Sequence, residues 1–164
     1  MYYNLCSPYR WMRGLTQKIE VTLETLLESV DLAEDITLRV AASVGFDEEQ
    51  GYRIGMSVRE AVINAYTYGN NQDRGRRIFL VFELFPAEMV IHVRDQGPGF
   101  RLEDVPDPLA EENLLKTSGR GLFLIQAFMD ELNVTIPQSG GAEVIMRKRY
   151  PSPPPPAPAG ASGA

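Results

Sequence analysis

Apolar and polar residues alternate along four stretches of the chain. The first covers residues 17–24, two more cover 77–85 and 89–94 with a Pro-Ala turn between them, and the last covers 141–149. Successive side chains of a strand point to opposite faces, so this alternation is typical of strands that are buried on one side. The short turn between the middle two stretches predicts a hairpin.

Apolar residues recur at helical spacing in three other stretches. Residues 26–44 predict one helix, residues 48–68 a second with Asp47 as its N-cap, and residues 122–132 a third. The stretch 95–121 is rich in glycine, proline and acidic residues and is expected to be irregular. Helices and strands in this order predict an α+β two-layer sandwich, in which a mixed, mainly antiparallel sheet is covered on one face by helices.

Length and composition predict one domain. The chain has 164 residues, 44% of them apolar, which is enough for one compact core. We expect this domain to span residues 17–150, after an N-terminal segment of residues 1–16. Residues 151–164 are mostly proline followed by alanine, glycine and serine, so a disordered tail is predicted. A docking motif for a proline-reading module is the alternative for this tail.

Net charge and the counts of cysteine and histidine limit the partners and the cellular compartment that can be expected. The formal charge of -6 argues against direct nucleic-acid binding, which needs clustered Lys and Arg, although mild acidity can also serve solubility alone. No apolar run reaches the roughly 20 residues that span a membrane, and no signal-peptide pattern opens the chain. A single cysteine, Cys6, excludes a disulfide framework, and a single histidine excludes a His-based metal cluster. A cytoplasmic location is therefore expected.

Glu60 and Asn64 form the first of three candidate motifs. Their separation of four residues places both side chains on one side of the second predicted helix, a turn apart. A carboxylate and an amide rarely enter apolar surroundings such as these without hydrogen-bond or metal partners. Taken alone, the pair is better explained as a satisfied polar pair at the boundary of the core.

The second motif, Asp95-Gln96-Gly97-Pro98-Gly99, follows directly after a predicted strand. Glycine reaches dihedral angles that other residues avoid, so the chain can turn sharply here and a flat ligand can lie close to it. The carboxylate of Asp95 can accept a hydrogen bond from an exocyclic amine such as that of adenine. Alone, the motif is explained more simply as a Gly-Pro turn.

The third motif, Ser118-Gly119-Arg120-Gly121-Leu122, opens a predicted helix. Glycines at a helix start expose main-chain N–H groups, and the helix dipole adds positive potential, so the pattern suits phosphate binding. A lone Gly-x-Gly is weak evidence, and the chain has no Walker pattern because Gly-Lys-Ser/Thr does not occur.

In this order, the three motifs resemble the asparagine box and the two glycine boxes of the ATPase superfamily of gyrases, histidine kinases and certain mismatch-repair proteins. Within it, the chain is similar to the bacterial anti-sigma factor serine/threonine kinases over roughly residues 17–149. The resemblance implies the histidine kinase-like ATPase fold, or Bergerat fold, with a left-handed crossover. It is carried by Glu60-Ala-Val-Ile-Asn64, Gly69-Asn70, Asp107-Pro108-Leu109 and Gly119-Arg120-Gly121-Leu122-Phe123.

The resemblance implies ATP and Mg²⁺ as ligands. Asn64 would hold the Mg²⁺ that bridges the phosphates, consistent with that ion's preference for oxygen ligands. Asp95 would bind the adenine amine, with Gly97 and Gly99 leaving room for the ring. Glu60 would act as the general base that deprotonates the attacking hydroxyl.

A lid of about residues 102–119 is implied as well, closing over the phosphates. The groups that would contact the phosphates are Lys116, Thr117, Ser118, Gly119, Arg120, Gly121 and Leu122. Two positions depart from the family pattern. Ala142 follows Gly141 where relatives usually carry a threonine that helps to hold adenine, and Tyr68 stands where many carry histidine. The lost threonine hydrogen bond would cost on the order of 1 kcal/mol of ATP binding.

The implied function is that of an ATP-dependent serine kinase and anti-sigma factor. It would phosphorylate a STAS-type anti-sigma factor antagonist, sequester a sigma factor and work as a homodimer. Two alternatives stay open: a nucleotide-sensitive module that sequesters a sigma factor without phosphate transfer, and a kinase that acts on an antagonist-like scaffold without binding sigma. A sensor histidine kinase fits poorly, because the only histidine, His92, lies inside a predicted strand.

Overall fold

The computed structural model describes residues 16–101 and 120–151. The predicted N-terminal segment before residue 16, the predicted lid at 102–119 and the tail from 152 lie outside the described residues. The described elements are, in chain order, β1 (Gln17–Glu24), α1 (Glu28–Val44), α2 (Glu48–Asn64), the π-helical segment η2 (Ala65–Gly69), β2 (Arg77–Leu84), β3 (Glu88–Arg94), α3 (Arg120–Phe128), β4 (Glu131–Thr135) and β5 (Glu143–Arg149).

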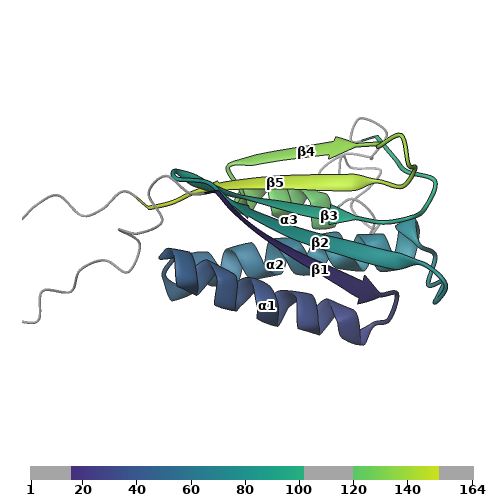
Figure 1. Ribbon diagram of the computed structural model, residues 1–164, viewed down its shortest axis with the longest axis horizontal. Coiled ribbons are helices and arrows are strands. Elements are labelled where there is room, and N and C mark those ends of the chain that lie inside the picture. The colour runs from purple at the N-terminus through teal and green to yellow at the C-terminus, as the bar shows by residue number, and fades with distance from the viewer. Residues whose placement is uncertain (1–15, 102–119, 152–164) are drawn as a thin grey trace, which may run out of the picture.

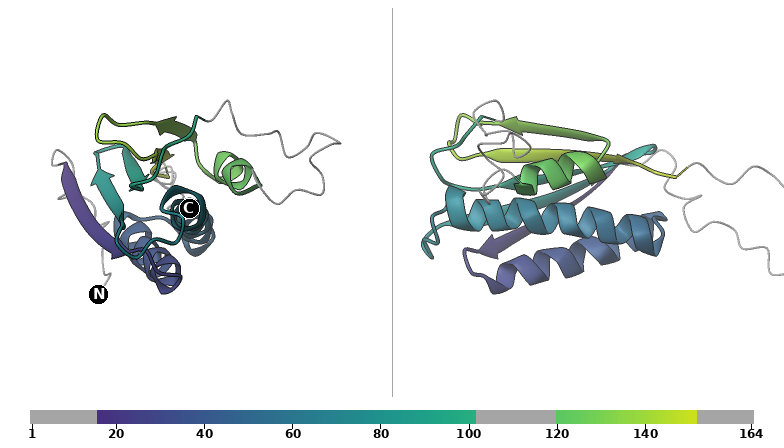
Figure 2. Two further views of the ribbon diagram at one scale, coloured as in Figure 1. Left: turned by 90° about the vertical axis from the view of Figure 1, so that its right-hand side faces the viewer. Right: turned by 180° about the vertical axis from the view of Figure 1, so that it is seen from behind.

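One sheet and three α-helices make up two layers. The sheet has five strands in the order β1-β2-β3-β5-β4, and its helices lie on one face (Figures 1 and 2). The predicted two-layer α+β fold is confirmed. A mixed, mainly antiparallel sheet was expected, and every pairing among the described strands is antiparallel. Antiparallel neighbours need no crossover helix between them, so short turns suffice between β2 and β3 and between β4 and β5.

The core lies between the sheet and α2, which packs between α1 and α3 (Figure 2). Every second residue of β2 is buried, and α2 buries residues at helical spacing, as the sequence pattern predicts. No described helix is long and apolar enough to cross a bilayer. The side chains at the centre of this core are at most 1% exposed and include Ile54, Val58, Val62, Ile78, Leu80, Phe82 and Ile91.

The predicted helix over residues 122–132 is wrong at its end. The helix α3 ends at Phe128, and a strand that was not predicted, β4, follows at Glu131–Thr135. Asp130 fixes the change of direction, because its N–H donates to the Arg147 carbonyl at 3.0 Å and its carboxylate accepts from the Arg149 N–H at 2.8 Å. Both partners belong to β5, so tertiary pairing decides where this helix stops.

Other boundaries differ by a few residues. The first helix begins at Glu28 rather than residue 26, because the Leu26 N–H donates to the Glu24 carbonyl at 2.9 Å in a turn. The second predicted helix, 48–68, is α-helical only to Asn64 and continues as η2. Asp47 caps it as predicted, accepting from the Gln50 N–H at 2.8 Å. Helix ends shift in this way when capping and turn geometry compete.

The only histidine lies on a strand, as expected. His92 is in β3, with Nε2 3.3 Å from Glu83 Oε2 and Nδ1 3.3 Å from Glu143 Oε1. Glu83 comes from β2 and Glu143 from β5, so the ring bridges cross-strand neighbours on the sheet. This placement supports a structural role for the histidine.

Tyr150, just after β5, makes the stability of the fold fall as the pH rises into the alkaline range. Its ring packs against Phe46, with centroids 5.7 Å apart, and its hydroxyl is buried without a hydrogen-bond partner among the described residues. Burial and the nearby charge of Glu88 raise the pKa of Tyr150 from 10.0 to about 12. A raised folded pKa means that the neutral phenol contributes stability below pH 10, which is lost as pH rises through 12.

We therefore expect Tyr150→Phe to lose less stability than the wild type between pH 10 and 12, since phenylalanine does not titrate. At pH 7 the variant should lie within about 1 kcal/mol of the wild type, because the removed hydroxyl made no bond. Urea denaturation at a series of pH values measures both effects. Tyr68→Phe makes the same change on a side chain that is 63% exposed and should follow the wild type. Equal alkaline losses in the wild type and Tyr150→Phe would contradict the assignment.

Candidate functional site

Glu60 and Asn64 lie one turn apart at the end of α2, and both are partly exposed. The first turn of α3 faces them. A Cβ added to Gly121 would lie 2.5 Å from Glu60 Oε2 and 3.4 Å from Asn64 Nδ2. A residue with a side chain at this position would displace the carboxylate, so glycine permits the close approach. The fold thus brings the first and third sequence motifs into contact.

Asp95 directly follows β3 and is only 5% exposed. Its Oδ1 accepts hydrogen bonds from the main-chain N–H groups of Gly97 at 2.8 Å and Ala142 at 3.1 Å. Its own N–H donates to the Ala142 carbonyl at 3.0 Å. Burying a carboxylate is costly unless it is hydrogen-bonded, and the two N–H groups offset that cost. They also fix the direction in which the carboxylate points.

Glycines surround this carboxylate because main-chain segments meet there without room for a Cβ. A Cβ on Gly69 would overlap the Asp95 carboxylate, one on Gly97 would overlap the Gly69 carbonyl, and one on Gly141 would overlap the Asp95 carbonyl. Gly99 and Gly141 also have φ angles of +81° and +85°, which favour glycine. Close packing with the Asp95 carboxylate and with main-chain atoms therefore requires these glycines, including the two expected to leave room for a ring.

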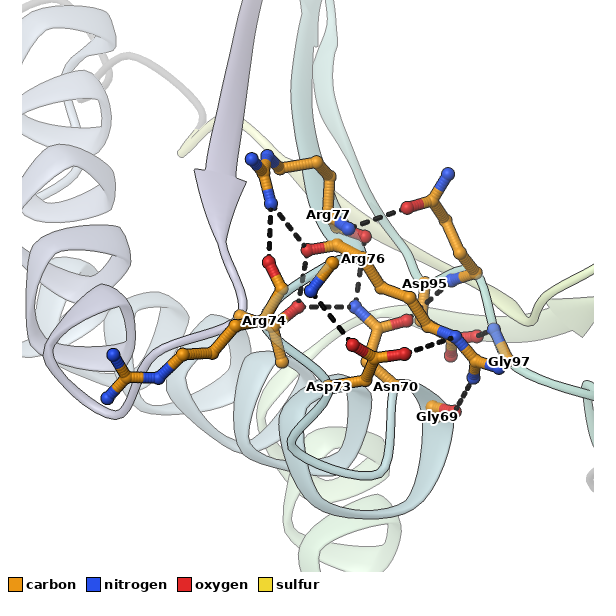
Figure 3. Close-up of polar contacts among 11 residues, drawn as sticks. Gly69, Asn70, Asp73, Arg74, Arg76, Arg77, Asp95 and Gly97 are labelled. Atoms are coloured by element: carbon orange, nitrogen blue, oxygen red, sulfur yellow. Dashed lines mark hydrogen bonds and ion pairs between the residues drawn. The ribbon is translucent and has the colours of Figure 1, made fainter.

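Asn70 joins three segments around the site (Figure 3). Its side chain is fully buried. Its Oδ1 accepts from the Gln96 N–H at 2.8 Å, and its Nδ2 donates to Thr25 Oγ1 at 2.8 Å and to the Arg77 carbonyl at 3.0 Å. Gln96 strengthens the link, because its Oε1 accepts from the Arg77 N–H at 2.6 Å. The sequence marks Asn70 as part of the resemblance, but not as a buried contact.

A hollow of about 460 Å³ opens beside this turn, and its lining includes Tyr68, Gly69, Arg76 and Pro98. Arg76 crosses it, donating from Nη1 to the Gly69 carbonyl at 3.5 Å and placing Nε 3.5 Å from Asp73 Oδ2. Tyr68 is 63% exposed at this hollow. Its replacement of the family's usual histidine therefore changes the rim of the site and leaves the core as it is.

The predicted residues thus gather at the end of α2. Glu60 and Asn64 meet Gly121 there, and η2 leads from Asn64 to Gly69, which contacts Asp95. The side chain of Leu122 instead points into the core and is 6% exposed, so only its main chain is available to a ligand. Arg120 lies exposed at the start of α3. The remaining predicted ligands, Lys116, Thr117, Ser118 and Gly119, lie outside the described residues.

The donor chemistry fits a magnesium nucleotide. Among residues 16–101 and 120–151, no three His, Cys, Asp or Glu side chains are placed to hold a metal ion. A metal here would depend on ligands from a bound substrate, which is how Mg²⁺ is usually held, through few protein oxygens and the substrate phosphates. Asn64 offers an amide oxygen, Asp95 a fixed acceptor for an amine, and the start of α3 main-chain N–H groups and the positive end of the helix dipole for an anion.

Comparison with known proteins agrees with this geometry. A family model described as a histidine kinase-like ATPase domain matches residues 23–148. The chain is 33% identical over 147 residues to the serine-protein kinase RsbW of Staphylococcus epidermidis, which covers 84% of this chain and 89% of the relative. It is 33% identical over 98 residues to the anti-sigma F factor of Clostridium perfringens strain SM101, covering 58% of this chain and 70% of the relative.

A solved structure shares the fold. The crystal structure of the RsbU and RsbW domains of a Mycobacterium tuberculosis protein matches with a TM-score of 0.58 and 17% sequence identity. The match covers 83% of this chain and 34% of that one, and at this identity it speaks for the fold alone. The family model and the sequence relatives show that the chain belongs to the bacterial anti-sigma factor serine kinases within the histidine kinase-like ATPase family.

The packing of Gly97 against Gly69 predicts a large stability loss for Gly97→Ala. The added Cβ would overlap the Gly69 main chain, which cannot move as a flexible side chain can, so we expect a loss of about 1–3 kcal/mol in the free energy of unfolding. Gly51→Ala, within α2, is the matched control. Among the described residues its Cβ would meet only the Cβ of Ala41 in α1, at 4.0 Å. It should stabilise by up to about 1 kcal/mol through helix propensity. Urea denaturation of both variants measures the difference, and equal effects would refute the close contact.

Proposed function

We propose that the chain is an ATP- and Mg²⁺-dependent serine kinase that also acts as an anti-sigma factor in the cytoplasm. It phosphorylates a serine of a STAS-type anti-sigma factor antagonist and, as a homodimer, sequesters a sigma factor. Unphosphorylated antagonist draws the kinase away from sigma, and phosphorylation of the antagonist releases the kinase again. The proposal draws on relatives named as a serine-protein kinase and as an anti-sigma F factor.

One observation carries the catalytic part of the proposal. Glu60 and Asn64 stand a turn apart on α2, and the glycine that opens α3 lies against both side chains. A base, a metal-binding amide and a phosphate-binding helix start are the groups that phosphoryl transfer needs in one place. Their assembly from segments almost 60 residues apart in sequence supports a catalytic site over a surface polar pair.

In this proposal Asn64 holds Mg²⁺ through its side-chain oxygen, and Asp95 accepts a hydrogen bond from the adenine amine. The main-chain N–H groups at Gly121 and Leu122, together with Lys116, Thr117, Ser118, Gly119 and Arg120, contact the phosphates. Asn64 would thereby place beside those phosphates a cation whose charge would offset theirs. Glu60 accepts the proton of the antagonist serine. The serine oxygen bonds to the γ-phosphorus, and the bond between that phosphorus and the departing ADP oxygen breaks.

Two substitutions separate binding from catalysis. Glu60→Gln keeps the shape of the side chain but removes its basicity, so ATP binding should stay within about twofold while phosphate transfer falls by a factor of about 10²–10⁴. Asn64→Ala removes the metal ligand and should abolish the Mg²⁺ dependence of ATP binding. Calorimetric titration with Mg-ATP measures binding, and labelled ATP with a cognate antagonist measures transfer.

Glu48→Gln is the control for these variants. It makes the same chemical change on an exposed residue in the first turn of α2, far from the site, and should behave as the wild type. If the wild type binds ATP but transfers no phosphate to any cognate antagonist, the chain is a sequestering module instead. If it phosphorylates a scaffold protein and does not co-purify with a sigma factor, it is a switch kinase. If it does not bind ATP, the proposed function fails.

A further inference from the structure

We propose that Asn70 is a positioning residue for nucleotide recognition: it holds the turn after β3 so that the Asp95 carboxylate selects an adenine base over a guanine base. The inference rests on the proposed function, because it takes Asp95 as the group that meets the base.

The amide of Asn70 is satisfied in one orientation only. Its oxygen faces the Gln96 N–H, a donor, and its nitrogen faces the Thr25 hydroxyl and the Arg77 carbonyl, which accept. Turning the amide over would place its NH₂ group against the Gln96 N–H and its oxygen against the Arg77 carbonyl. Burial with 0% exposure leaves no water to relieve such a mismatch. Asn70 is therefore held rigidly.

Asn70 and Asp95 hold neighbouring N–H groups of the same turn. The Gln96 N–H donates to Asn70, and the next one, that of Gly97, donates to Asp95 Oδ1. Gly69, directly before Asn70, lies against the Asp95 carboxylate. Gly69 thus packs against the Asp95 side chain, and Asn70 accepts a hydrogen bond from the main chain of the turn. Loss of the Asn70 oxygen frees the Gln96 N–H, which directly precedes the Gly97 N–H that holds the Asp95 carboxylate.

The direction of Asp95 matters because the two purines differ at this edge. Adenine carries an amine at its sixth position, which donates to a carboxylate, whereas guanine carries a carbonyl there, which a carboxylate repels. Sites built around a buried hydrogen bond discriminate strongly against ligands that cannot make it. The ratio of ATP to GTP affinity therefore reports the position of Asp95, and a general loss of stability does not change this ratio.

The test compares Asn70→Ala with Thr25→Val by calorimetric titration with ATP and GTP, well below the melting temperature of each variant. Thr25→Val removes the hydroxyl that accepts from Asn70 Nδ2 and donates to the Arg76 carbonyl at 2.9 Å, so it weakens the same network without releasing Gln96. Asn70→Ala should weaken ATP binding about tenfold and leave GTP binding nearly unchanged. Thr25→Val should keep the wild-type ATP:GTP ratio.

Asn70→Asp gives a second measurement, which also serves if Asn70→Ala does not fold. The aspartate keeps an acceptor for the Gln96 N–H, loses the two donated bonds and buries a charge facing the Arg77 carbonyl, so it should be less stable but retain the preference for ATP. An unchanged ATP:GTP ratio in Asn70→Ala, or a lost preference in Asn70→Asp with Thr25→Val normal, overturns the positioning role alone. A wild type that does not bind ATP overturns the proposed function and this inference together, whereas one that binds ATP and GTP equally overturns this inference alone.

Discussion

The burial of one carboxylate, that of Asp95, constrains the geometry around the candidate site. A charge at 5% exposure needs hydrogen bonds, and both donors to its Oδ1 are main-chain N–H groups, from Gly97 and Ala142. The segments around the carboxylate pack so closely that a Cβ at position 69, 97 or 141 would overlap Asp95 or the Gly69 main chain, so glycines stand there. The pairing of β3 with β5 continues by one residue through Asp95 and Ala142. The sheet and the site are therefore built from the same contacts.

A single helical segment carries most of the remaining groups. From its cap at Asp47, α2 buries one face in the core and presents Glu60 and Asn64 beside α3. It then continues as η2, which widens the last turn and ends at Gly69 against Asp95. π-Helical turns are uncommon and often lie at functional sites. Here the turn joins the metal-binding end of the proposed site to its base-binding end.

Local patterns predicted the elements well where one face of the chain meets the core. The alternation in β1 and β2 and the helical spacing in α2 gave elements close to those observed, because burial on one face leaves a period in the sequence. The strand β4 was missed, although Leu132 and Val134 alternate with polar residues. Five residues are too few to outweigh the helical pattern before them, and the helix stops through contacts of Asp130 with β5.

The candidate site could be predicted from the sequence only in part. Glu60, Asn64 and Asp95 were identified through the order of three short motifs and their resemblance to a known family. The contact of Gly97 with Gly69 and the bonds of Asn70 with Thr25 and Gln96 depend on segments more than 20 residues apart, which no local pattern encodes. Sequence therefore indicated the glycines but not the contacts between distant segments that leave no room for a Cβ there.

The most direct test of the account is ATP binding by Asp95→Asn, measured by calorimetry with Mg²⁺ present. Asparagine keeps the shape and can still accept from Gly97 and Ala142, but its NH₂ group then points toward the position proposed for the adenine amine, which also donates. The account predicts a folded protein whose ATP affinity falls about 10- to 100-fold, the range for a lost hydrogen bond to a charged group. Wild-type affinity for ATP in Asp95→Asn would contradict the assignment of this carboxylate to the base.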